Sequence, residues 1–165
     1  MSPIDQTTDL TFDTMPAKVG EALGTSDWVD MTQDRVNQFA ECTKDHQWIH
    51  TDPERAKRES PFGGPVAHGY LTLSLLAGLS SEMDIVPKGA AAVINYGLDK
   101  VRFLAPVPVG ARVRLHMKLM SWEQTPKGPF MMKTENTVEI EGSDKPALIA
   151  ENIGLVVPPA PSKDA

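Results

Sequence analysis

The chain has 165 residues, a length that fits one domain with a sizeable buried core. Its 41% hydrophobic and 23% charged residues are ordinary for a globular protein, and its net charge of −6, without a Lys/Arg cluster, argues against nucleic-acid binding. The single cysteine, Cys42, excludes an internal disulfide and a zinc site built from several thiolates, which fits a reducing, cytoplasmic location.

Both ends of the chain are expected to be flexible. Residues 1–15 carry three aspartates and lack the basic start and apolar run of a signal peptide. Residues 158–165 are rich in proline and form a second tail. Residues 16–157 are therefore predicted to be a single folded domain.

Three helices are expected in the first half of that domain. Thr32 is predicted to cap the first, and after a loop over residues 45–50, Asp52-Pro53 starts a short second one. A glycine–proline loop over residues 60–65 leads to a third helix, from His68 to about Ser80. This third helix is apolar on every side, so we expect other structure to enclose it, and its apolar run is too short to span a membrane.

The second half of the chain changes from a helical to an alternating pattern. Apolar and polar residues alternate over residues 112–119 and 130–141, which predicts two half-buried strands. Residues 91–104 and 147–157 complete a set of four, with turns at residues 125–129 and 142–145. The pattern predicts an α+β fold, in which an antiparallel sheet wraps around one buried central helix.

The chemistry-bearing residues lie before and at the start of that helix. Asp45 and His50 are a carboxylate and an imidazole five residues apart, and both groups can move protons near neutral pH. Gly69, in the first helical turn, can offer a bare backbone N–H and the positive end of the helix dipole to a developing oxyanion. This combination suits adding water to, or removing it from, a carbon near a carbonyl group.

A set of motifs around these residues resembles the MaoC-like (R)-specific enoyl-CoA hydratases, a family with the hotdog fold. The resemblance covers about residues 18–157 and is closest to the subgroup of nodulation protein N and a mycobacterial hydratase. Lys44 and Gln47-Trp48 depart from the wider family, where glycine and Asn-Pro are usual. The matching residues are Asp45, Ile49, His50, Asp52-Pro53, Ala56, residues 66–69 and residues 95–103.

The resemblance implies reversible syn hydration of trans-2-enoyl thioesters to (R)-3-hydroxyacyl thioesters by a homodimer. Asp45 and His50 would be the acid–base pair and Gly69 the oxyanion donor. No cofactor is implied, because CoA is part of the substrate, and neither a membrane nor a nucleic acid is an expected partner. The residues expected to contact substrate are His68, Ser74, Asn95, Tyr96 and Arg102.

Each of these residues also has a structural interpretation. Asp45 could close a turn, Gly69 could serve helix packing, and His68 could cap the helix instead of lining a pocket. Ser74 could bond to the preceding helical turn, and the three residues on the strand could be ordinary strand residues. His46, His50 and Asp45 are poorly spread for a tetrahedral metal site, so no metal is predicted.

Two other functions stay open at the level of sequence. Hotdog thioesterases use a carboxylate and a helix-start oxyanion donor on the same fold, so the fold does not choose between hydration and hydrolysis. A non-catalytic subunit that only binds acyl thioesters is the third hypothesis. The position of the Asp45–His50 pair before the central helix favours the hydratase over both.

Overall fold

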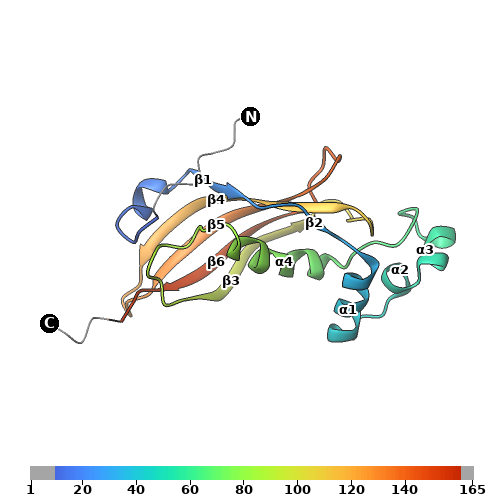
Figure 1. Cartoon of the computed structure of the whole chain (residues 1–165), viewed down its shortest axis with the longest axis horizontal. Coiled ribbons are helices and arrows are strands. Elements are labelled where there is room, and N and C mark those ends of the chain that lie inside the picture. Colours follow the sequence, from blue (N-terminus) through green and yellow to red (C-terminus); the bar gives the residue numbers. More distant parts are fainter. Residues whose placement is uncertain (1–9, 161–165) are drawn as a thin grey trace.

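The computed structural model describes residues 10–160, and its main feature is a curved antiparallel sheet that wraps around one long helix (Figure 1). The strands follow the order β1-β4-β5-β6-β3 across the sheet, and β2 also pairs with β4. This is the hotdog arrangement predicted from the sequence. The strands are β1 (Ala22–Thr25), β2 (Val29–Asp30), β3 (Ala92–Phe103), β4 (Arg112–Gln124), β5 (Phe130–Ile140) and β6 (Leu148–Val157).

The alternating pattern of the second half explains the sheet. β4 and β5 form a hairpin in which Val113 pairs with Ile140 and Leu115 pairs with Val138, and all four side chains are buried on the concave face. The four predicted strands are therefore confirmed. The sequence did not reveal β1 and β2, because strands of four and two residues are too short to show a period.

Helix α4 (Gly69–Ser81) lies on the concave face of the sheet and buries Leu71, Leu76 and Leu79 there. Its other face is open in the single chain, where Tyr70 is 71% exposed. The expectation that the helix is enclosed on every side is therefore wrong for one chain, because the sheet ends at β3 and leaves that flank uncovered. Within residues 10–160, no helix has the length and apolar character needed to cross a membrane.

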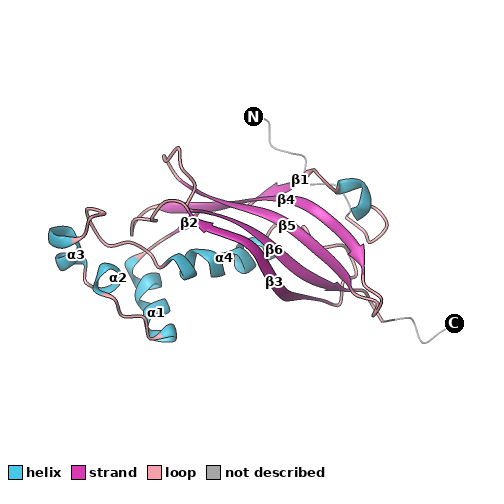
Figure 2. Cartoon of the chain, turned by 180° about the vertical axis from the view of Figure 1, so that it is seen from behind, coloured by secondary structure: helices cyan, strands magenta, loops and turns pink. Residues whose placement is uncertain are grey.

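Three short helices gather at the end of the sheet near the start of α4 (Figure 2). They are α1 (Gln33–Thr43), α2 (Trp48–Thr51) and α3 (Pro53–Glu59). The predicted caps are confirmed: Thr32 accepts a hydrogen bond from the Arg35 N–H, and Asp52 accepts one from the Arg55 N–H. The predicted loop over residues 45–50 is corrected, because α2 already begins at Trp48 and its single turn is too short for a helical pattern to appear.

The N-terminal segment is packed against the sheet over its described part. Leu10 and Met15 are buried in one cluster with Trp122, and Met15 is the first residue of a 3₁₀ helix, η1 (Met15–Lys18). The ring of Phe12 packs against the ring of Trp122, with the two ring centroids 5.8 Å apart. The prediction of a flexible segment over residues 1–15 is therefore wrong for residues 10–15, where three apolar side chains complete a second core cluster. Residues 1–9 and 161–165 lie outside the described part.

Candidate active site

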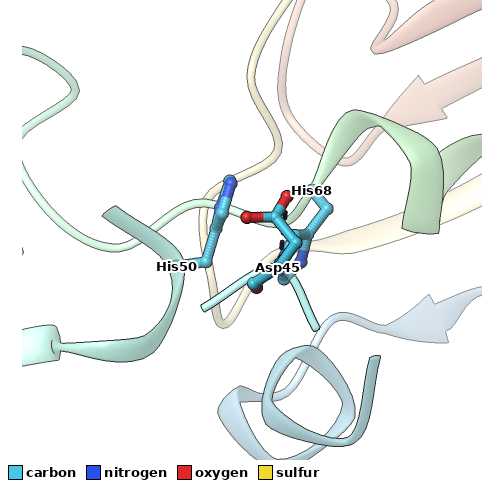
Figure 3. A group of neighbouring side chains, drawn as sticks. All are labelled: Asp45, His50 and His68. Carbon is cyan, nitrogen blue, oxygen red and sulfur yellow. Dashed lines mark hydrogen bonds and ion pairs between the residues drawn. The ribbon is translucent and has the colours of Figure 1, made fainter. Parts of the chain in front are cut away.

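Three side chains from three separate segments meet near the start of α4 (Figure 3). Asp45 follows α1, His50 lies within α2, and His68 precedes α4 by one residue. One nitrogen or carboxylate oxygen from each lies within 4.8 Å of the others. The structure therefore brings together the two residues expected to move protons and adds His68 to them.

Asp45 reaches this position through a tight turn at the end of α1. Lys44, the C-cap residue, has a left-handed backbone with φ 66°, which ends the helix and redirects the chain. The backbone N–H of Gln47 lies at 3.4 Å from Oδ1 of Asp45, a long contact. The Asp45 side chain is 51% exposed, so the carboxylate is open to water and to a ligand.

His50 is buried, and its hydrogen bond determines which ring nitrogen carries the proton. Nδ1 lies 2.6 Å from the carbonyl oxygen of Val66. A carbonyl oxygen only accepts, so Nδ1–H donates, and in the neutral ring Nε2 keeps its lone pair. Burial is the largest cause that lowers the pKa of His50 from 6.5, and His68 lowers it further, while the Val66 carbonyl and Asp45 act in the opposite direction. His50 is thus a neutral proton acceptor near pH 7.

His68 is 2% exposed and contacts both members of the pair. Its ring stacks on the ring of His50 with centroids 3.9 Å apart and planes 27° apart. Its Nε2–H donates to the main-chain carbonyl of Asp45 at 3.0 Å, and Nε2 lies 4.0 Å from Oδ2 of the same residue. Its side chain makes no capping bond to α4.

Gly69 is the first residue of α4, so its N–H has no partner within the helix and lies at the positive end of the dipole. An added Cβ would lie 3.1 Å from two ring carbons of Phe103 on β3. An alanine at this position would therefore require the Phe103 ring to shift by a few tenths of an ångström.

A pocket of about 300 Å³ lies beside His50 and Gly69, and neither Asp45 nor His68 is among the residues that line it. His50 and Gly69 both line it, together with Phe103. Most of the other lining side chains are apolar, and they come from α2, from the segment before α4 and from the loop between β3 and β4. A proton acceptor, an N–H donor and an apolar wall therefore share one cavity, which suits a ligand with a carbonyl group and a carbon chain.

Comparison with known proteins places this arrangement in a family. The family model described as "MaoC like domain" matches residues 14–140. This chain belongs to the MaoC-like domain family.

Named relatives and a solved structure agree with that assignment. The chain is 53% identical over 139 residues to 3-hydroxyacyl-thioester dehydratase Z of Mycobacterium tuberculosis, covering 84% of this chain and 91% of the relative. It is 41% identical over 148 residues to nodulation protein N of Rhizobium leguminosarum bv. viciae, covering 90% and 92%. The structure titled "(R)-hydratase from A. caviae involved in PHA biosynthesis" is 25% identical with a TM-score of 0.67, covering 86% of this chain and 96% of that one.

The remaining predicted residues of this MaoC-like chain lie apart from the three clustered side chains. Ser74, Asn95 and Tyr96 line a second pocket of about 480 Å³ between α4 and β3. The Ser74 hydroxyl also donates to the carbonyl of Leu71, as the structural interpretation expected. Arg102 lines neither of these two pockets and is exposed, with Nη1 donating to the carbonyl of its neighbour Val101.

Sequence reasoning missed two contributors to the site of this MaoC-like domain. The carbonyl of Val66 sets the tautomer of His50. Because every residue has a backbone carbonyl, the identity of residue 66 gives no sign of this contact. Phe103 forms the wall beside Gly69. Its position at the end of the motif over residues 95–103 indicated that Phe103 could have a role. The motif did not show that its ring would contact Gly69.

Proposed function

We propose that this chain is a hydro-lyase that reversibly hydrates trans-2-enoyl thioesters to (R)-3-hydroxyacyl thioesters. The observation that carries the proposal is that the Asp45 carboxylate and the His50 ring lie close together, while His50 and the helix-start Gly69 line the same pocket. The names of the relatives, a dehydratase of 3-hydroxyacyl thioesters and an (R)-hydratase, support the same reaction and stereochemistry.

The pair can hold one water in the orientation that the reaction needs. A carboxylate oxygen and a neutral Nε2 both accept hydrogen bonds, so a water between them donates both of its hydrogens and turns an oxygen lone pair toward the substrate. As this oxygen attacks C3, one proton passes to the pair, and the pair returns a proton to C2. The product gains one H and one OH on the same face, and no other reactant is needed.

Gly69 stabilises the charge that develops during this addition. Attack at C3 moves the double-bond electrons toward C2 and onto the thioester oxygen, which becomes enolate-like. The N–H of Gly69 and the positive end of α4 would lie against this oxygen. In the reverse direction, the same N–H would assist removal of the C2 proton, after which the 3-hydroxyl leaves as water.

We propose that the reaction uses no metal and no cofactor beyond the thioester carrier. Asp45, His50 and His68 have the residue types of metal ligands and lie close together. The two rings are stacked with planes only 27° apart, however, so their in-plane lone pairs do not converge on one point.

We further propose a homodimer formed through the edge of β3, working in the cytoplasm. In the single chain β3 lies at the edge of the sheet, and Ile94 and Tyr96 on it are 52% and 62% exposed. An exposed apolar edge strand invites pairing with another strand, and a second copy would cover it together with the open face of α4. The free, exposed Cys42 is consistent with a reducing compartment.

Incubation of the pure protein with crotonyl-CoA tests the proposed reaction against its two alternatives. A hydratase lowers the enone absorbance without releasing thiol, a thioesterase releases thiol, and a protein that only binds acyl thioesters changes neither signal. Chiral analysis of the product should show the R isomer. Prolonged chelation before the assay should leave the rate unchanged, and a loss that added zinc restores would contradict the metal-free mechanism.

A further inference from the structure

His68 contributes the shortest hydrogen bond that the structure records for Asp45. The Asp45 carbonyl accepts from His68 Nε2–H at 3.0 Å. The other bonds recorded for this residue are longer: its N–H lies 3.4 Å from the Thr43 hydroxyl, and its Oδ1 lies 3.4 Å from the Gln47 N–H. With a half-exposed side chain and weak local contacts, Asp45 depends on a residue 23 positions further along the chain for its position.

The ring of His68 is itself held firmly. It stacks on His50 at 3.9 Å, and the ring of Phe39 contacts it at 5.0 Å. It is 2% exposed, and a side chain held by packing on both sides can serve as a support for its neighbours. His68 thus contacts the main chain of one member of the acid–base pair and the ring of the other.

Its place in the chain links this pair to the oxyanion donor. His68 directly precedes Gly69, the first residue of α4. Its side chain does not cap the helix, and, like Asp45, it is absent from the lining of the pocket that His50 and Gly69 share. The expectation that His68 contacts substrate stays a prediction; in the single chain its ring is buried and stacks on the ring of His50.

We infer that His68 is a positioning residue that holds Asp45 and His50 at a set distance from the Gly69 N–H. The inference rests on the proposed hydration, in which the water between the pair must reach C3 while the thioester oxygen stays at Gly69. Displacement of such groups by about 1 Å costs on the order of 100-fold in rate. His68 touches neither water nor substrate in this arrangement and acts only through its two neighbours.

Two substitutions separate the hydrogen bond from the stacking. His68→Phe keeps a flat ring against His50 and removes the donor, whereas His68→Gln brings an amide N–H close to the place of Nε2. We expect His68→Phe to lower kcat by ~10–100-fold with KM changed by less than about threefold, since the interaction matters in the transition state. His68→Gln should recover several-fold of that loss.

Leu79→Ala is the matched control for stability. Leu79 is buried in the same helix, 3% exposed, and ten residues beyond Gly69, about 15 Å along the axis. This variant should lower the melting temperature and leave kcat near the wild-type value. Wild-type kcat in His68→Phe, an effect mainly on KM, or equal kcat in His68→Phe and His68→Gln would overturn the inference.

A measurement without activity keeps the inference separate from the proposed function. NMR of protein labelled with nitrogen isotope in its histidines should show a proton on Nε2 of His68 and, in neutral His50, the proton on Nδ1. His68 protonated on Nδ1 alone would overturn the inference even in an active enzyme. Failure of the wild type to hydrate crotonyl-CoA would instead reject the proposed reaction and leave the tautomer result standing.

Discussion

Asp45 and His50 differ in burial and in hydrogen bonding, yet the proposed reaction treats them as one unit. Asp45 is half exposed and charged, whereas His50 is buried and held by the Val66 carbonyl. Their joint task is to orient one water. When two residues act together in this way, removal of either one abolishes most of their joint contribution to the rate.

Asp45→Asn and His50→Gln should each lower kcat by at least ~100-fold, because one general acid–base group contributes ~10²–10⁴ in rate. Each change keeps similar size and polarity, so the melting temperature should change little. The double variant should be only slightly slower than the worse single one, since the water is already misplaced. Multiplying losses would indicate two independent residues, and near-normal hydration by either single variant would reject the pair.

The buried position of His50 predicts a pH dependence of activity. Burial, the largest cause, lowers its pKa below 6.5, so the ring stays a neutral acceptor at pH 6.5 and above. As pH falls through the lowered pKa, Nε2 gains a proton and kcat/KM should fall. A profile of kcat/KM should therefore place the acid limb below pH 6.5, and a limb above that value would contradict the assignment.

The same shift should affect folding stability. An unfolded histidine takes up a proton near pH 6.5, while folded His50 does so only at lower pH. The unfolded state therefore binds more protons between the two pKa values, and the free energy of unfolding falls as pH drops from about 6.5 through the folded pKa. Urea unfolding of His50→Gln should show less of this loss than the wild type.

Gly69 and Phe103 should behave as a steric pair. An alanine Cβ at position 69 would lie 3.1 Å from the Phe103 ring, tighter than an ordinary contact, so Gly69→Ala should lower kcat by displacing the ring or the helix start. Gly69→Val should nearly abolish turnover without unfolding the protein. Adding Phe103→Leu to Gly69→Ala should restore part of kcat. If Phe103→Leu restores no activity, the alanine methyl group clashes with the substrate and not with the Phe103 ring. Full activity in Gly69→Val would show that the Gly69 N–H has no role in the mechanism.

At the scale of elements, the described N-terminal segment and η1 behave as part of the domain. Met15 is fully buried and Leu10 nearly so, in a cluster with Trp122 and Met132 on β4 and β5. This cluster is separate from the core cluster that contains the buried residues of α4. Its apolar contacts should make the segment contribute to the stability of the whole fold.

Met15→Ala should lower the free energy of unfolding by about 2–5 kcal/mol, because it leaves a cavity in a closed cluster. Asp13→Ala, two residues earlier and exposed, should change it by less than ~0.5 kcal/mol. Urea unfolding curves of both variants provide the comparison. Equal stability of Met15→Ala and wild type would mean that residues 10–15 do not pack against the sheet in solution.

At the scale of the whole molecule, a single chain leaves the β3 edge and one flank of α4 open. The large apolar side chains exposed there are Tyr70, Val93, Ile94, Tyr96, Leu98 and Phe103. Most of the large apolar side chains exposed in the described part of the chain belong to this flank. Such a concentration marks an interface.

Light scattering at micromolar concentration should give a mass near twice 18.0 kDa. Ile94→Lys, which places a charge on the open edge, should shift the mass toward one chain. Val19→Lys is the control, because Val19 is 44% exposed on a different part of the surface, and this variant should keep the wild-type mass. A wild-type mass near 18.0 kDa would reject the homodimer.

The sequence by itself was enough for the long elements and for selecting Asp45 and His50, which the structure brings close together, as the candidate acid–base pair. A continuous apolar run reveals α4, and alternating apolar and polar residues reveal β4 and β5. The caps at Thr32 and Asp52 mark helix starts. All of these signals depend on neighbours along the chain. The motif around Asp45 and His50 was enough for a family and a reaction. Short elements such as β1, β2 and α2 leave no such period.

Only the tertiary structure decided how residues far apart in sequence meet. The bond from His68 to the Asp45 carbonyl spans 23 positions, and the one from His50 to the Val66 carbonyl spans 16. Phe103 lies against Gly69, and Leu10 and Met15 lie against Trp122, for the same reason. Such contacts depend on the path of the chain and on close packing, which a one-dimensional pattern does not encode.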